Sequence, residues 1–225
     1  ALSRALSEFG IEAENSNPDA ITAPGEGAYE LVQEEDALQG WIDEIQLAGV
    51  FAFDTETNSL DAIKADLVGL SLSVQGGRAC YVPVAHVPAG NQRNDELDLG
   101  AIRSNVSPEL PKQLARNRVI EMLKPLLEDP GILKVGHNIK YDMQVMARYG
   151  VEVGPIDDTM LLSYVLEGGL HGHGLDELAA LHLGHTNIKF SEVAGTGKNQ
   201  VSFDHVPLDK ALDYAAEDAE VTGRL

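Results

Sequence analysis

Two carboxylates stand at a spacing that places them side by side. Asp54 and Glu56 follow the apolar run Val50–Phe53, and on a strand residues two apart point to the same face. Like charges this close repel each other unless a cation neutralises them, and hard divalent cations such as Mg²⁺ prefer carboxylate oxygen. The pair therefore indicates a metal site, with a solvated turn after a strand as the plain alternative.

Two further pairs have helical spacing. Asn138 and Asp142 lie four residues apart, as do Tyr214 and Asp218, and residues at i and i+4 share one helix face. A tyrosine hydroxyl has an ordinary pKa of about 10, so Tyr214 is better suited to orient a water molecule than to deprotonate it. The plain alternatives are an N-cap at Asn138 and a surface helix around Tyr214.

The elements that must position these residues alternate strands and helices. The sequence predicts strands over residues 29–32, 50–53, 67–74, 79–84 and 132–135. It predicts helices from residue 34 onward and over 119–127, 140–149, 158–166, 175–183 and 208–225. Asp157 or Asp158 can cap the start of the helix that ends at residue 166. The small residues Ala215, Ala216 and Ala219 would let the last helix pack closely. Gln75-Gly76-Gly77 reads as a hairpin turn. This order favours an α/β fold whose mixed β-sheet has one antiparallel strand and is flanked by helices.

Composition limits the class of protein. The apolar fraction of 44% in 225 residues is ordinary for a globular domain, and the single thiol, Cys80, excludes a disulfide framework or a cysteine-rich metal site. No apolar run approaches the roughly 20 residues that span a bilayer, so no membrane partner is expected. The net charge of −20 argues against binding nucleic acid by bulk electrostatics, although half of it precedes residue 51.

The two ends of the chain predict its organisation. Residues 10–28 combine Pro, Gly, Asn and acidic residues, which is typical of a linker, and residues 88–111 read as an irregular polar excursion with three prolines. The last helical pattern runs to the end of the chain. We therefore expect residues 1–27 to be the linker or tail of an upstream domain, residues 28–225 to be one domain, and the chain to be an excerpt of a longer polypeptide.

Taken together, the three motifs resemble the RNase H-like 3′–5′ exonucleases that carry Asp, Glu, Asp and Asp plus Tyr. The likeness is strongest to the proofreading domain of bacterial family A DNA polymerases, the DNA polymerase I family, over residues 28–225. It rests on the segments FAFDTETNSLD, LVGLSLSV, YVPVAH, LLEDPGILKVGHNIKYD, DDTMLLSYVL, VAGTGKNQVSF and YAAEDAEVT.

The resemblance implies a two-metal 3′–5′ exonuclease that removes mispaired nucleotides from single-stranded or frayed DNA ends during replication and repair. It implies that four carboxylates hold two Mg²⁺ or Mn²⁺ ions, with Zn²⁺ as an alternative in one site, and that a tyrosine orients the attacking water: Asp54, Glu56, Asp142 and Asp218, with Tyr214. It implies that the following residues contact the DNA strand: Thr55, Leu60, Asn138, Phe190 and Lys198. A polymerase domain of the same polypeptide would follow, in a monomer of the bacterial cytoplasm associated with the nucleoid.

One stretch departs from the family. Gly172 stands where an Arg is often found, so an Arg–phosphate contact is expected to be missing. His171 and His173 invite a zinc interpretation, but no third ligand has the right spacing. His137 is expected to pack or to contact substrate. Gly197-Lys198 lacks the spacing of a Walker phosphate loop and is expected to be a flexible loop.

Three alternatives remain open at this point. The first is an RNA-trimming exonuclease of the ribonuclease D type, which uses the same five residues. The second is a scaffold domain of a polymerase whose site is catalytically silent. The third is a nucleic-acid-binding module without chemistry, which fits poorly with so few clustered basic residues.

Overall fold

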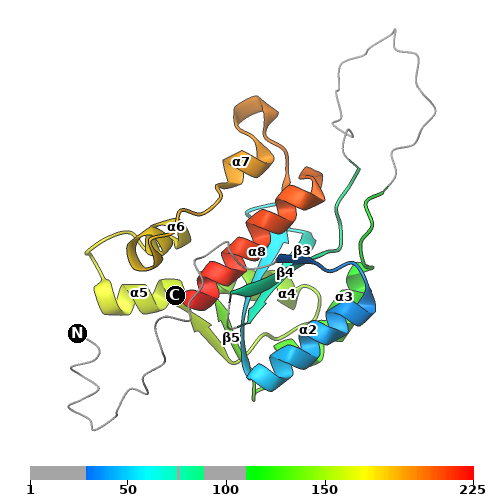
Figure 1. The fold of residues 1–225 in the computed structure, drawn as a ribbon, viewed down its shortest axis with the longest axis horizontal. Coiled ribbons are helices and arrows are strands. Elements are labelled where there is room, and N and C mark those ends of the chain that lie inside the picture. The colour runs from blue at the N-terminus through cyan, green and yellow to red at the C-terminus, as the bar shows by residue number, and fades with distance from the viewer. Residues whose placement is uncertain (1–28, 75–76, 89–109) are drawn as a thin grey trace.

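The computed structural model describes residues 29–74, 77–88 and 110–225 (Figure 1). The predictions made for residues 1–28, for the hairpin residues Gln75-Gly76 and for most of the 88–111 excursion fall outside these ranges. None of the helices in the described ranges has the length and apolar character needed to cross a bilayer.

A six-stranded sheet forms the centre of the described structure, in the order β1-β4-β3-β2-β5-β6. Its strands are β1 (Tyr29–Leu31), β2 (Val50–Thr57), β3 (Leu67–Val74), β4 (Arg78–Pro83), β5 (Leu133–Gly136) and β6 (Ile156–Asp158). Strand β3 runs antiparallel to both of its neighbours, whereas the other three pairings are parallel. The predicted mixed sheet with one antiparallel strand is confirmed, and β6 is a strand that the sequence did not indicate.

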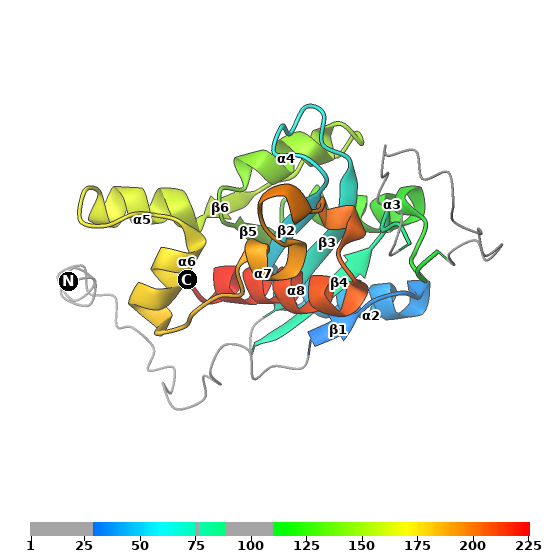
Figure 2. The same cartoon turned by 90° about the horizontal axis from the view of Figure 1, so that it is seen from above.

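Helices cover both faces of the sheet (Figure 2). They are α2 (Glu35–Ala48), α3 (Arg116–Leu127), α4 (Lys140–Ala147), α5 (Thr159–Glu167), α6 (Leu175–Leu178), α7 (Phe190–Ala194) and α8 (Leu208–Arg224). A π-helical segment, Ala179–Leu183, continues α6, and two 3₁₀ turns span Gly197–Asn199 and Phe203–His205. Helices α5 and α6 lie beyond the β6 edge of the sheet (Figure 2).

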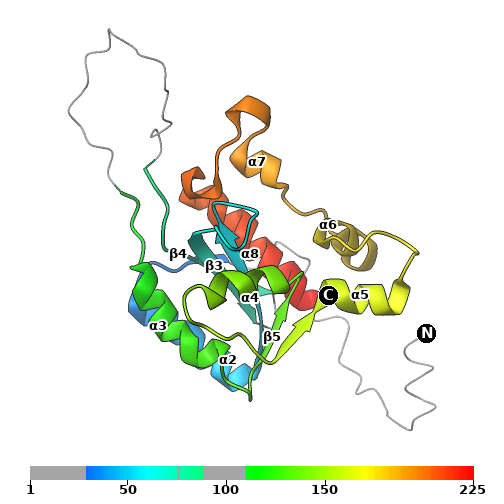
Figure 3. The same cartoon turned by 180° about the vertical axis from the view of Figure 1, so that it is seen from behind.

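The larger hydrophobic core fills one face of the sheet. It is formed by apolar side chains of α2, α3 and α4, including Leu38, Trp41 and Leu123, against sheet residues such as Phe51 and Phe53. Figure 3 shows these three helices on the same side of the sheet. The apolar positions of α2 recur at helical spacing, so this face becomes buried while the acidic face meets solvent. The core thereby fixes the strand whose far end carries Asp54.

Helix α8 covers the other face with small side chains. Ala211, Ala215 and Ala219 are fully buried, and a Cβ placed at Gly223 would lie 3.2 Å from the Cβ of Ala52. Small residues let a helix backbone approach a sheet closely, because no long side chain holds the two apart. The predicted close packing of this helix is confirmed, and it brings Asp218 against β2.

Three expectations about local structure are wrong. Asn138 has a φ of 58° and precedes α4, so it is neither an N-cap nor a neighbour of Asp142 on one helix face. Helix α4 ends at Ala147 rather than at Tyr149. The predicted cap of α5 is confirmed, because the Asp158 side chain accepts hydrogen bonds from the backbone N–H groups at the start of that helix.

Candidate active site

Strand β2 extends beyond the end of its parallel neighbour β5, and Asp54 and Glu56 lie on this extension. Residues Val50–Ala52 of β2 pair with β5, whereas pairing with β3 continues to Thr57. Asp54 and Glu56 therefore lie past the carboxyl end of β5, where an open edge leaves room for a ligand. Open α/β sheets bind ligands at such carboxyl ends.

Alternation along β2 sends its side chains to two different helices. Ala52 faces α8, so Asp54 and Glu56, two and four residues on, face that helix too. Thr55 points the opposite way and meets α4, where its backbone N–H donates to Asp142 Oδ1 at 3.0 Å. The Thr55 hydroxyl donates to the same oxygen. The amide of Thr55 is thus occupied by Asp142, which it holds beside the other carboxylates.

The four carboxylates crowd one another, and their pKa values respond. Burial, and then the charge of Asp218, raise the pKa of Asp54 from 3.8 to about 8. Burial, and then Glu217, raise the pKa of Asp218 to about 8. The pKa values of Glu56 and Asp142 are raised well above the ordinary range, chiefly by burial and then by Asp54.

These groups lack a cationic partner within the described ranges. None of the ion pairs there involves any of the four carboxylates. A cluster of buried and half-buried carboxylates must therefore take up protons or bind cations. Its donor atoms are all oxygen, which suits hard divalent cations such as Mg²⁺ and Mn²⁺.

Tyr214 lies one helical turn before Asp218 on α8. Burial is the main cause that raises the pKa of its hydroxyl, and the charges of Asp218 and Glu56 add to it. Tyr214 therefore stays protonated at neutral pH and acts as a hydrogen-bond donor. Its ring packs edge-on against Phe190, with the ring centroids 6.1 Å apart, and Phe190 in turn stacks on Phe203.

A cleft of about 790 Å³ opens over the carboxylates. Its lining includes nine of the ten predicted site residues: Asp54, Thr55, Glu56, Leu60, Asn138, Asp142, Phe190, Tyr214 and Asp218. Leu60 stands at its edge with 99% of its surface exposed. Lys198 is not part of the lining; it lies exposed in the 3₁₀ turn Gly197–Asn199. A second cavity of about 550 Å³ shares Phe190, Tyr214 and Asp218 with the cleft.

Tyr141 fixes the loop that carries Leu60. Its hydroxyl donates to the backbone carbonyl of Ser59 and is hydrogen-bonded to the Thr57 hydroxyl. Helix α4 therefore holds both a carboxylate, Asp142, and the edge of the cleft. This role of Tyr141 was not predicted, because an aromatic residue next to a helical Asp is usually part of the core.

Asp158 holds Asn138 in its left-handed conformation. The Asp158 carboxylate accepts from the backbone N–H groups of Asn138 and Ile139 at 3.0 and 3.2 Å, besides capping α5. The sequence indicated only the cap. Asn138 tolerates a positive φ better than most residues, and this turn sends its side chain into the lining of the cleft.

Glu217 organises the segment that precedes α7. It is buried, and its two carboxylate oxygens lie 2.8 Å from His185 Nε2 and 2.6 Å from the backbone N of Ile188. The sequence shows a second acid beside Asp218 in an alanine-rich helix. The spacing does not tell which segment the Glu217 side chain contacts.

His137 lines the cleft, as one of its two expected roles requires. Its Nδ1 is 2.8 Å from the Thr159 hydroxyl, and its Nε2 is buried without a hydrogen-bond partner among the described residues. Burial lowers the pKa of His137, so the ring is neutral.

The chain is similar to known exonucleases. A family model described as 3′–5′ exonuclease, from DNA polymerases of family A, matches residues 29–225. The chain is 40% identical over 242 residues to DNA polymerase I of Rhizobium leguminosarum, with 99% of the chain and 22% of that relative covered. The chain thus spans about a fifth of the relative's length.

Solved structures show the same RNase H-like fold at lower identity. NrnC of Brucella melitensis with bound Mg²⁺ is 21% identical, with a TM-score of 0.55 over 87% of this chain and 75% of that one. RNase D of Escherichia coli, an exoribonuclease involved in structured RNA processing, is 18% identical, with a TM-score of 0.59 over 86% of this chain and 42% of that one. The match over residues 29–225 and the identity to a DNA polymerase I place the chain in the 3′–5′ exonuclease domain family of family A DNA polymerases.

Proposed function

We propose that the chain is a metal-dependent exonuclease that removes single nucleotides from the 3′ end of single-stranded or frayed DNA. The products are a 5′-nucleoside monophosphate and a strand shorter by one nucleotide. The observation that carries the proposal is the convergence of four carboxylates, free of ion pairs within the described ranges, in a cleft large enough for a nucleotide.

The residues that would hold the cations are Asp54, Glu56, Asp142 and Asp218, and the cations would be two Mg²⁺ or Mn²⁺ ions. When bound, such a pair activates a water molecule and stabilises the departing 3′ oxygen. The all-oxygen donor set and the raised pKa values support this assignment. The Mg²⁺ in the similarly folded NrnC supports it as well.

The chain's own residues would orient the reactants. The protonated Tyr214 hydroxyl would donate a hydrogen bond to the attacking water, while Glu56 would accept one from it. Tyr214 is assigned the role of donor because its raised pKa excludes it as a base at neutral pH. The ring of Phe190 and the exposed Leu60 would hold the terminal bases by stacking and wedging, an interaction that tolerates any sequence.

Selection of mispaired ends would follow from the cost of fraying. A strand must leave its duplex before its end reaches the carboxylates, and a mispaired end costs less to separate. The remaining contacts to the strand would come from Asn138, which lines the cleft, and from the exposed Lys198. An RNA substrate is the alternative, because the fold is similar to that of RNase D.

The decisive experiment follows a 5′-labelled oligonucleotide with Mg²⁺ or with EDTA. We expect stepwise shortening from the 3′ end with Mg²⁺ only, and loss of at least about 100-fold in rate in Asp54→Ala and Asp218→Ala. Asp209→Ala is the matched control, because Asp209 is exposed on the same helix, α8. Full activity in either active-site variant would contradict the assignment. Faster cleavage of a matched RNA would identify an RNA-trimming enzyme instead.

We further propose that the chain works beside a polymerase domain in one polypeptide, as its length relative to the Rhizobium relative suggests. With a net charge of −20 the chain would grip DNA weakly when alone. A neighbouring domain would then supply most of the affinity. Since the relative is a bacterial DNA polymerase, we place the working protein, as a monomer, in the cytoplasm near the nucleoid.

A further inference from the structure

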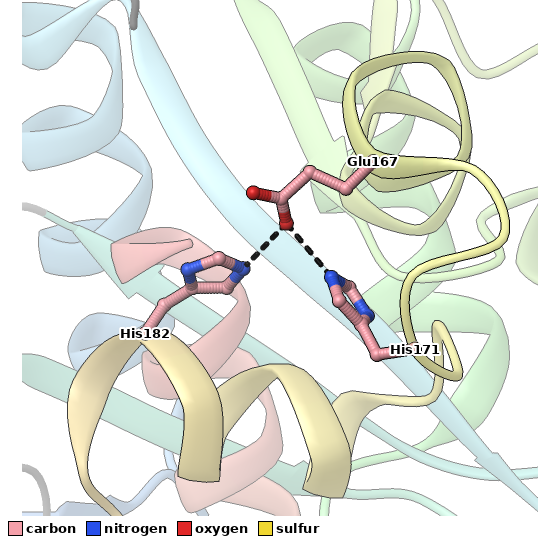
Figure 4. A group of neighbouring side chains, drawn as sticks. All are labelled: Glu167, His171 and His182. Carbon is pink, nitrogen blue, oxygen red and sulfur yellow. Dashed lines mark hydrogen bonds and ion pairs between the residues drawn. The ribbon is translucent and has the colours of Figure 1, made fainter.

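A second group of metal-binding side chains gathers where α5 ends. Glu167 is the last residue of α5, His171 lies in the turn that follows, and His182 belongs to the π-helical segment Ala179–Leu183. The candidate ligand atoms of the three all lie within 4.8 Å of one another. In Figure 4 the Glu167 carboxylate stands between the two imidazole rings. None of the three is among the residues that line the two cavities described above.

The distances suit a tetrahedral ion. Glu167 Oε2 lies 2.8 Å from His171 Nε2 and 3.5 Å from His182 Nε2. Zinc binds nitrogen and oxygen at about 2.0–2.1 Å, which separates neighbouring ligands of a tetrahedron by about 3.4 Å. Small side-chain movements would therefore bring all three atoms to bonding distance of one ion, with a fourth position facing the exposed side of His182.

The ring of His171 is already oriented for such an ion. Its Nδ1 lies 2.6 Å from the carbonyl oxygen of Gly172, so Nδ1–H donates there. Nε2 faces Glu167, to which it donates in the metal-free chain, and on losing that proton it can bind the ion. A second-sphere carbonyl that fixes the imidazole in this way accompanies most metal-bound histidines. The turn is itself held, because Glu177 accepts a hydrogen bond from the Gly172 backbone at 2.8 Å.

The neighbouring His173 is committed elsewhere. Its Nδ1 is 2.7 Å from the Ser163 hydroxyl, the side chain is buried, and its ring lies against Tyr164 with centroids 3.8 Å apart. His171 therefore finds its partners outside the His171–His173 pair. Helix α5 supplies Glu167, and the π-helical segment supplies His182. Spacing alone could not reveal this, because His182 is eleven residues beyond His171 and the chain folds back between them.

We propose that Glu167, His171 and His182 bind one zinc ion, with water in the fourth position, which fastens the end of α5 to the segment Ala179–Leu183. Two imidazole nitrogens and one carboxylate oxygen form a donor set that Zn²⁺ favours over Mg²⁺. The two sites of the chain therefore sort ions by donor type: hard cations go to the carboxylates of β2, α4 and α8, and zinc goes to the end of α5.

The test is a calorimetric titration of Zn²⁺ into the 225-residue chain carrying Asp54→Ala and Asp218→Ala, which removes competition from the carboxylate cluster. We expect one bound ion per chain. Adding His182→Ala should weaken binding by at least about tenfold, whereas adding His205→Ala should leave it unchanged. His205 is the matched control because it too faces a carboxylate, Asp204, at 3.1 Å.

A second readout separates a metal site from a simple ion pair. Co²⁺ in place of Zn²⁺ should give the visible absorption of a tetrahedral complex, and both His182→Ala and Glu167→Gln should abolish it while circular dichroism shows an unchanged fold. His182 is well exposed, so its loss leaves no cavity. Absence of Zn²⁺ binding in the double variant, or equal binding after His182→Ala, would overturn the proposal.

Discussion

The carboxyl groups at the end of β2 make the metal-free protein sensitive to pH. The pKa of Asp54 is about 8 in the folded chain against 3.8 when exposed, so the folded state binds a proton that the unfolded state releases. Such a raised pKa stabilises the fold below about pH 4, and this contribution is lost as the pH rises through about 8. The raised pKa values of Glu56 and Asp142 act in the same direction.

We therefore expect Asp54→Asn to stabilise the metal-free chain at pH 8, because the amide keeps the shape and removes the charge. The gain in the free energy of unfolding should be at least about 1 kcal/mol, the value of one pKa unit. It should shrink toward pH 5. Urea unfolding in EDTA at both pH values measures it, with Asp209→Asn as the exposed control. An equal effect at both pH values would exclude a titrating Asp54.

The proposed role of Tyr214 is to orient the attacking water, and a substitution of this residue can test that role. We expect Tyr214→Phe to lower kcat by about 10- to 100-fold, because a misplaced reactant costs up to about 100-fold, while KM for an oligonucleotide stays within about twofold. The ring and its contact with Phe190 remain in this variant. Tyr164→Phe, on the exposed face of α5, is the control. A rise in KM with unchanged kcat would instead make Tyr214 a strand-binding residue.

At the scale of elements, β5 depends on a buried lysine. Lys134 is fully buried, and its Nζ donates to the carbonyls of Asp129, Ile132 and Gly154 at 2.7–2.8 Å. These bonds join β5 to the turn before it and to the segment that leads into β6. The ammonium group thus holds β5 in register, and the carboxylates of the cleft lie just past the end of that strand.

Replacing this lysine should destabilise the fold. We expect Lys134→Met to lower the free energy of unfolding by about 1–3 kcal/mol, the cost of leaving buried acceptors unpaired. Chemical unfolding measures the loss, and Lys140→Met, on the exposed start of α4, should change stability little. A Lys134→Met variant as stable as the wild type would mean that water replaces the ammonium at the three carbonyls.

The elements differ in how readily the sequence predicts them. Strands β2 to β5 and helix α8 follow from their apolar periodicity, which reflects burial against a sheet. Strand β6 and helix α7 are three and five residues long, and such short segments carry no period. Asn138 departs from the expected helix because Asp158, twenty residues later, holds its backbone.

The residues of the candidate site could be identified from the sequence where their types and order match a known family. The four carboxylates and Tyr214 line one cleft, as the resemblance to the exonuclease family implied. The supporting contacts of Thr55, Tyr141 and Glu217 were not predictable. They depend on which helix each side chain meets, and this is decided by packing between elements far apart in sequence.

At the scale of the whole molecule, the charge of −20 takes on a different meaning. Half of it precedes residue 51, and α2 carries part of that half on its solvent face. The carboxylates of the cleft account for four more of the formal negative charges, and in their ionised form two divalent cations would balance them. The acidity therefore does not exclude a nucleic-acid substrate, and under the proposed function bound metal would be required before such a substrate could bind.

The unpaired carboxylates at the end of β2 have a consequence for the history of such domains. Each repels its neighbours, so a neutral replacement at any of these positions would relieve the fold of a repulsion that the proposed cations would otherwise offset. A lineage that ceased to need the cleavage would lose these acids early and keep a sturdier sheet and helices.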